Sequence, residues 1–159
     1  MPAAGERTPT ARLRELGLQL PEPPRPLGHY VAAVRTGAFL VLSGMLPLRD
    51  GVPTTIGRIG DSVTIAGGVA AARLAALNAL AVAEQALGTL DRVRRVVRAT
   101  VSMTTTPRFE AHAAVADGAS DLFASLFDEG HTRVALGAYT LPLGTAILLD
   151  VIFEIHTED

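Results

Sequence analysis

The stretch from residue 132 to residue 156, TRVALGAYTLPLGTAILLDVIFEIH, decides the fold of this chain of 159 residues. Two aliphatic and β-branched runs flank Leu-Pro-Leu-Gly at 141–144, a pattern that predicts two strands joined by a turn. Strand alternation places Arg133 on one face of the first strand. The residues that share this face are Ala135, Gly137 and Tyr139.

Arg133 is an unusual start for a strand of small residues. A guanidinium does not lose its proton, so a buried arginine either meets a carboxylate or suffers a large desolvation cost. We expect this carboxylate to belong to a ligand. The alternative is a structural ion pair with Glu154, with Asp150 or with another subunit.

Length and composition indicate one domain that associates with copies of itself. Hydrophobic residues make up 48% of the chain and aromatic residues only 4%, so the core must be built from Ala, Val, Leu and Ile. The net charge of −2 gives no general attraction to nucleic acid or to an anionic membrane. We therefore expect the partners to be a small carboxylate-bearing metabolite and further copies of the chain.

The chain contains no lysine and no cysteine, and its 14 basic residues are all arginines. These absences exclude Schiff-base chemistry, a covalently bound pyridoxal cofactor, thiolate nucleophiles and disulfides. The four histidines lack the spacing of metal ligands, so we predict no metal site and no cofactor. Because no apolar segment suits a signal peptide or a membrane span, we expect a soluble, cytoplasmic protein.

The chain divides into an N-terminal tether, residues 1–25, and a domain, residues 26–159. The tether contains a short helix that Thr10 would cap and that would end at Leu18. The proline-rich stretch 20–26 then enforces an extended path into the domain.

The domain shows the order strand, strand, helix, strand, helix, strand, strand. This order predicts an α+β fold in which both helices lie on one face of a single sheet. Since nothing in the chain remains to cover the other face, we expect sheets of neighbouring subunits to meet in a homo-oligomer. The predicted strands are 28–36, 39–43, 92–104 and the two between 132 and 156, and the predicted helices are 62–87 and 109–127.

Four local motifs, in register with this order of elements, resemble the Rid family, also called YjgF/YER057c/UK114. Residues 26–30, PLGHY, stand where the family has Pro-Ile-Gly-Pro-Tyr, and residues 43–47, SGMLP, stand where it has Ser-Gly-Gln-Ile-Pro. The third motif is Arg133 followed by Leu-Pro at 141–142, and the fourth is the closing strand. The resemblance covers the chain from about residue 26 to residue 155.

The resemblance implies a chorismate-mutase-like ββαβαββ fold that assembles as a homotrimer, with ligand clefts between subunits. It also implies that Arg133 grips the carboxylate of the substrate, that Gly44 offers a backbone amide, and that Tyr30 lines the cleft. These three residues are the candidate catalytic residues. Met45, which follows Gly44, and Tyr139 complete the candidate substrate-binding residues.

The chain departs from the deaminases of the family at the glutamate that holds the attacking water. The Leu-Pro register puts Leu148 at this position, and a leucine cannot position water. Asp150 lies two residues further along, on the same strand face. Ala135 and Pro107 stand where other members have a cysteine or similar small residue and an asparagine.

We predict a hydrolase of weakened activity, an enamine/imine deaminase that converts small imino acids to 2-keto acids and ammonia. The alternative is a non-hydrolytic small-carboxylate binding protein, or a specialised metabolic enzyme, on the same trimer. An endoribonuclease is a third hypothesis, and it rests on a basic patch that lacks the stacking aromatics of nucleic-acid binders. The arginines of this patch, which we expect at a solvated strand edge, are Arg92, Arg94, Arg95 and Arg98.

Two smaller expectations concern the second predicted helix. Asp117 and Asp121 lie four residues apart and are expected to face water, because like charges at this spacing repel. Ser120, like Ser43, is expected to lack the base of a nucleophilic pair.

Overall fold

A computed structural model describes residues 7–157 of the chain. The strands of the main sheet are β1 (Ala33–Thr36), β2 (Phe39–Leu42), β5 (Val93–Thr104), β6 (Thr132–Ala138) and β7 (Ile147–Ile155). The long helices are α2 (Ile65–Leu87) and α3 (His112–Leu126). The smaller elements are α1 (Pro9–Glu15), the hairpin of β3 (Leu48–Arg49) and β4 (Val52–Pro53), and the 3-10 turns η1 (Leu90–Arg92) and η2 (Pro142–Gly144).

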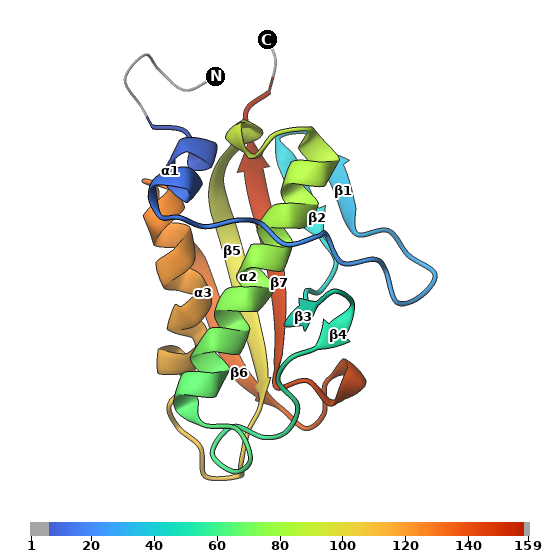
Figure 1. Cartoon of the computed structure of the whole chain (residues 1–159), viewed down its shortest axis with the longest axis vertical. Helices are drawn as coiled ribbons and strands as arrows, with labels where there is room; N and C mark the ends of the chain where they lie inside the picture. Colours follow the sequence, from blue (N-terminus) through green and yellow to red (C-terminus); the bar gives the residue numbers. More distant parts are fainter. Residues whose placement is uncertain (1–6, 158–159) are drawn as a thin grey trace.

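The five main strands form one sheet in the order β1-β2-β7-β5-β6, with α2 and α3 side by side on one face (Figure 1). Strands β5 and β6 pair in parallel, and the other neighbours in the sheet are antiparallel. This arrangement confirms the predicted ββαβαββ order and the α+β class. The hairpin of β3 and β4 lies between the predicted strand 39–43 and the predicted helix 62–87, where no element was predicted.

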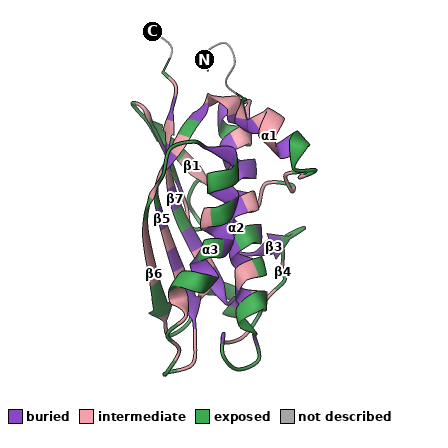
Figure 2. Cartoon of the chain, turned by 90° about the vertical axis from the view of Figure 1, so that its left-hand side faces the viewer, coloured by how far each residue is buried: buried purple, intermediate pink, exposed green. Residues whose placement is uncertain are grey.

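The core lies between the sheet and the two long helices. Strand β7 occupies the middle of the sheet, and every second side chain along it points to the helices and is fully buried. Figure 2 shows the same division, with buried residues on the helix side and exposed or half-buried residues on the outer side. The helix-facing residues of β7 are Ile147, Leu149, Val151 and Phe153.

Both long helices begin later than the sequence pattern predicted. Helix α2 begins at Ile65 because the hydroxyl of Thr64 accepts a hydrogen bond from the Gly67 amide, which is an N-cap. Helix α3 begins at His112 rather than at residue 109, because the Phe109 amide donates to a carbonyl in the preceding turn.

The short N-terminal helix was predicted, but its cap was assigned to the wrong threonine. The hydroxyl of Thr8 caps the helix, whereas the amide of Thr10 donates to Asp91 Oδ1 at 2.9 Å. The helix ends at Glu15, before the predicted end at Leu18. Because of the Asp91 contact, this segment is docked onto the domain rather than being only a tether.

The two long helices approach each other closely at a glycine. A Cβ atom added to Gly118 on α3 would lie 2.1 Å from the carbonyl oxygen of Val69 on α2, far inside van der Waals contact. Only a residue without a side chain therefore allows the helices to pack at this spacing.

Helix α2 passes the length and composition test for a membrane span, with a mean hydropathy of 1.7, which differs from the sequence expectation. However, 61% of its apolar window is buried inside the molecule. Such burial is that of a core helix in a soluble domain, and the cytoplasmic location stays a prediction.

The outer face of the sheet is uncovered by any element between residues 7 and 157 (Figure 2), and polar side chains such as Arg98 and Asp150 occupy its middle strands. Strands β1 and β2 expose Val34, Phe39 and Val41 on this face, and β6 exposes Leu136. Isolated apolar residues are ordinary at a surface, but the neighbouring set of Val34, Phe39 and Val41 is typical of an interaction site.

The close approach at Gly118 yields a stability prediction. We expect Gly118→Ala to lower the free energy of unfolding by about 1 to 3 kcal/mol, because the added methyl group forces the two helices apart. The matched control is Gly130→Ala, where an added Cβ meets nothing within 4 Å. Urea unfolding of both variants would contradict the packing argument if their losses of stability were equal.

Candidate functional site

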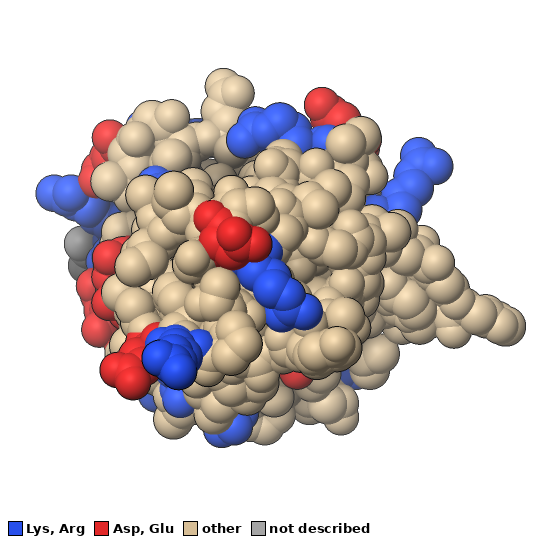
Figure 3. All heavy atoms as spheres, turned by 90° about the horizontal axis from the view of Figure 1, so that it is seen from below, with Lys and Arg blue, Asp and Glu red and all other residues tan. Residues whose placement is uncertain are grey.

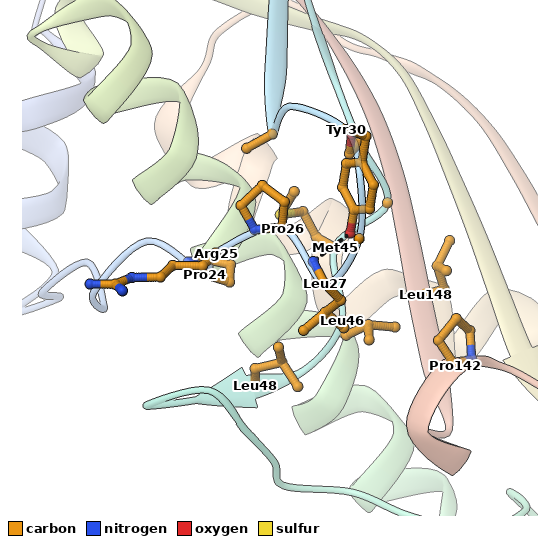
Figure 4. Close-up of a pocket in the computed structure, with 14 residues that line it drawn as sticks. Pro24, Arg25, Pro26, Leu27, Tyr30, Met45, Leu46, Leu48, Pro142 and Leu148 are labelled. Atoms are coloured by element: carbon orange, nitrogen blue, oxygen red, sulfur yellow. Dashed lines mark hydrogen bonds between the residues drawn. The ribbon is translucent and has the colours of Figure 1, made fainter.

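A cavity of about 330 Å³ lies where the segment before β1, the loop after β2 and the start of β7 meet (Figure 4). Three of the predicted site residues line it together: Tyr30, Gly44 and Met45. Leu148 on β7 and Pro142 in η2 form the opposite wall. The structure therefore brings together one part of the predicted site within a single chain.

Tyr30 is half exposed, and its position is fixed by the segment that precedes it. The hydroxyl oxygen of Tyr30 accepts a hydrogen bond from the Leu27 amide at 3.0 Å. The Tyr30 amide in turn donates to the Gly28 carbonyl at 3.0 Å. These two bonds hold the ring as a wall of the cavity.

Gly44 offers a free backbone amide to the cavity. The neighbouring amides are engaged, since that of Ser43 donates to Ala32 and that of Met45 donates to Leu149. The Gly44 amide donates to no group within residues 7–157. It is therefore available to a ligand, as the family resemblance implied.

Leu148 packs directly onto Gly44. A Cβ atom at Gly44 would lie 3.1 Å from Leu148 Cδ2, which is tighter than ordinary contact. Among the described residues, no aspartate or glutamate lines this cavity. Asp150, the nearby acid considered from the sequence, is exposed and is not part of the lining.

Asn78 holds the loop that carries these groups, and the sequence analysis missed it. Its side-chain amide, buried on α2, donates to the carbonyls of Leu46 and Leu48 at 2.9 Å each. Its Oδ1 atom accepts no hydrogen bond from the part of the chain that the structure describes. The available signal was that Asn78 is the one asparagine of the sequence and lies inside an alanine-rich apolar helix.

Arg133 lies away from this cavity and has a partner within its own chain. Its Nη1 atom donates to Asp117 Oδ1 at 2.6 Å and to Ser120 Oγ at 3.1 Å. The arginine side chain is 24% exposed and that of Asp117 is 53% exposed. The intrachain partners considered from the sequence, Glu154 and Asp150, were wrong. Asp117, which was expected only to face water, accepts a hydrogen bond from Arg133.

Ser120 has a histidine partner, which corrects a second expectation. Its hydroxyl oxygen lies 3.0 Å from His131 Nε2. Burial, and then the positive charge of Arg133, lower the pKa of His131. The neutral imidazole is thus favoured, and it can accept the hydrogen bond of a hydroxyl that itself accepts one from Arg133.

Tyr139 lies at the far end of β6, beside a different and more open cavity. Its side chain is 87% exposed. The Arg58 guanidinium lies 5.4 Å from the centre of the Tyr139 ring, and its Nη2 atom donates to the Tyr139 carbonyl at 2.6 Å. The structure thus separates Tyr139 from Tyr30 and Gly44 within one subunit.

Two of the four arginines in the patch are paired with acids. Strand β6 pairs only with residues 98–104 of β5, so Arg94 and Arg95 lie at a free strand edge as predicted, whereas Arg98 lies where β5 is flanked by β7 and β6. Arg94 and Arg95 both form ion pairs with Glu129 and Glu154. Figure 3 shows basic and acidic side chains next to one another at the lower end of the molecule as well. Neither surface presents the unpaired basic stripe that favours nucleic-acid binding.

Residues 7–157 contain no group of three or more acidic or histidine side chains placed to hold a metal ion. The chemistry available at the cavity is therefore that of an amide donor, a tyrosine and apolar walls.

Comparison with known proteins gives a consistent family. The sequence model described as "YjgF/chorismate mutase-like, putative endoribonuclease" matches residues 10–155. Protein TCP17 of Trypanosoma cruzi is 41% identical over 149 residues, which span 92% of this chain and 93% of that protein.

Two crystal structures show the same fold. A protein from Shewanella oneidensis with the same endoribonuclease description is 34% identical, with a TM-score of 0.89 over 94% of this chain and 100% of that one. The protein Atu1372 of Agrobacterium tumefaciens, of unknown function, is 35% identical, with a TM-score of 0.85 over 93% and 92% of the two chains.

The environment of His131 predicts a pH dependence of stability. The folded-state pKa of His131 lies below the value of about 6.5 in an unfolded chain. At a pH between these two pKa values the unfolded state binds more protons than the folded state. The free energy of unfolding therefore decreases as the pH falls. The contribution of neutral His131 to the free energy of unfolding is fully present above about pH 6.5. It is lost as the pH falls toward the lowered pKa.

We expect His131→Gln to flatten this part of the pH profile in urea unfolding between about pH 8 and pH 5. His29→Gln, at an exposed histidine, is the control and should keep the wild-type slope. An unchanged slope in His131→Gln would contradict the assignment.

Proposed function

The chain belongs to the YjgF/chorismate mutase-like family, also called Rid, and we propose that it forms a homotrimer that binds a small carboxylate-bearing metabolite between subunits. The observation that carries this proposal is the division of the candidate site. Tyr30 and Gly44 lie on the β1-β2 side of the sheet, and Arg133 lies on β6 at the opposite edge.

Two half-sites on opposite sides of one sheet cannot meet within one chain. They meet when the β1-β2 edge of one subunit contacts the β6 edge of the next. Such a head-to-tail contact closes into a ring if the rotation between subunits permits. The exposed apolar residues on both sides support this contact, with Phe39 and Val41 on β2 and Leu136 on β6. Burial of this face would stabilise a ring by about 25 cal/mol for each Å² removed from water.

The pair of Arg133 and Asp117 supports the proposed role of the arginine. In this pair the guanidinium already binds a carboxylate, and the half-exposed position of Asp117 supports the proposal that a ligand carboxylate replaces it. A ligand carboxylate that replaced Asp117 would contribute about 1.5 to 3 kcal/mol through charge-assisted hydrogen bonds. The Gly44 amide of the neighbouring subunit would bind the other polar end of the ligand.

Hydrolysis of an imino acid is the second candidate function. Retention of the arginine, of the Gly44 amide and of Tyr30 favours it. In this reaction water adds to the imine carbon, and the carbon–nitrogen bond then breaks to give ammonia and a 2-keto acid. Since Leu148 replaces the family glutamate, no carboxylate among the described lining residues holds this water, and slow turnover is expected.

The binding proposal is tested with Arg133→Ala and a set of 2-keto acids from pyruvate to phenylpyruvate. Light scattering should give three times the chain mass of 16.6 kDa for the wild type. Calorimetry should show that Arg133→Ala weakens binding by about 10- to 150-fold. Arg73→Ala, at an exposed arginine on α2, is the matched control and should bind as the wild type does. Equal binding by Arg133→Ala would overturn the role of the arginine.

The hydrolysis candidate is tested by restoring the acid. We expect Leu148→Glu to release ammonia from freshly generated 2-iminopropionate at least about tenfold faster than the wild type, because a positioned base contributes about 10²- to 10⁴-fold in optimised sites. Leu148→Gln has the same length without the carboxylate and serves as the control. If the two variants react at the same rate, the pocket lacks more than a group that holds water.

A further inference from the structure

We propose that the ligand of this site carries a bulky apolar group, aromatic or branched aliphatic, and that the cavity between Tyr30 and Leu148 receives that group. The inference rests on the proposed function, since it names the class of carboxylate that the site takes. It follows from the walls of the cavity and from the hydrogen bonds already made within them.

The walls are mostly apolar. They are formed by Pro24, Pro26, Met45, Leu46, Leu48 and Leu148 (Figure 4). The cavity volume is about 330 Å³. An apolar cavity of about 150 Å³ already accepts a benzene ring, so a phenyl or isobutyl group fits here.

The polar side chains of the cavity are few, and they are partly engaged or turned away. The Tyr30 hydroxyl oxygen accepts from the Leu27 amide, and the Ser43 hydroxyl donates to the Val31 carbonyl at 2.7 Å. Figure 4 shows the Arg25 side chain directed away from the other labelled residues. A charged or hydroxylated ligand tail would lose its hydration here and gain at most the remaining donor of the Tyr30 hydroxyl and the remaining acceptor of Ser43, which is unfavourable against walls that are mostly apolar.

The backbone amide of Gly44 remains in position for the ligand, and it lies at the end of the apolar wall. The Gly44 amide is free within residues 7–157, and Leu148 packs on the same glycine. A ligand whose polar head meets the Gly44 amide thus has its adjacent carbon atoms against Leu148. Where the family deaminases have a carboxylate, this chain has a surface that favours hydrocarbon.

The size of the expected preference follows from apolar burial. Each buried methylene group contributes about 0.8 kcal/mol, which corresponds to about a fourfold gain in affinity. A branched or aromatic 2-keto acid should therefore bind at least about tenfold more tightly than pyruvate. A dicarboxylate of similar length should gain nothing from its longer chain.

The experiment is calorimetry on the full chain with the sodium salts of pyruvate, 2-oxobutanoate, 4-methyl-2-oxopentanoate, phenylpyruvate and 2-oxoglutarate. We expect affinity to rise with apolar size, and 2-oxoglutarate to bind at least about tenfold more weakly than 4-methyl-2-oxopentanoate. The difference between phenylpyruvate and 4-methyl-2-oxopentanoate distinguishes an aromatic from a branched aliphatic group.

A matched pair of variants locates the preference. Leu148→Gln should reduce the ratio between 4-methyl-2-oxopentanoate and 2-oxoglutarate to within about threefold, because the amide provides a partner for a polar tail. Val52→Ala, at an exposed residue of β4, should leave the ratio unchanged. The affinities of the wild-type chain for the five acids do not depend on either variant. They therefore test the apolar preference even if Leu148→Gln folds poorly.

The outcomes separate this inference from the proposed function. If all five acids bind with equal affinity, or the dicarboxylate binds best, the apolar preference is overturned while carboxylate binding stands. If none of the acids binds, both the preference and the proposed function fail.

Discussion

The permanent positive charge of Arg133 is the constraint on which the rest of this site depends. A guanidinium stays charged at every physiological pH, so a position that is three-quarters buried requires an anion nearby. In the single chain Asp117 meets this requirement from α3, together with the hydroxyl of Ser120. Because Asp117 is half exposed, the arrangement resembles a resting state in which an internal carboxylate takes the place of an external one. If a ligand carboxylate replaces Asp117 as proposed, its affinity would be the difference between two similar contacts.

The sheet explains why this charge and the cavity lie apart. Strands β1 and β6 are the two edges, and three strands separate them. The helices cover one face only, and the other face exposes apolar residues on β1, β2 and β6 with polar residues of β7 and β5 between them. Assembly through this surface would serve stability and site formation at once. The same contact that removes apolar area from water would bring Arg133 of one subunit toward Gly44 of the next.

Sequence patterns predicted the order of strands and helices because strand alternation and turn residues are local signals. They predicted the face of Arg133 for the same reason. Its partner was missed because Asp117 lies on a helix, and strand alternation says nothing about how that helix is rotated over the sheet. The contact between Ser120 and His131 depends on the same rotation. Asn78 was missed because its role is to satisfy carbonyls of a loop that only the folded chain places beside α2.

The proline-rich segment before β1 has a consequence for the energetics of recognition. Its prolines have a restricted backbone, and they form one wall of the cavity together with the Leu27 amide held by Tyr30. A wall of this kind would lose little conformational entropy when a ligand binds, and it would keep the shape of the cavity in the absence of ligand. Selectivity between ligands would then reflect how well each one fits a rigid cavity, rather than the free energy needed to reorganise the protein around it.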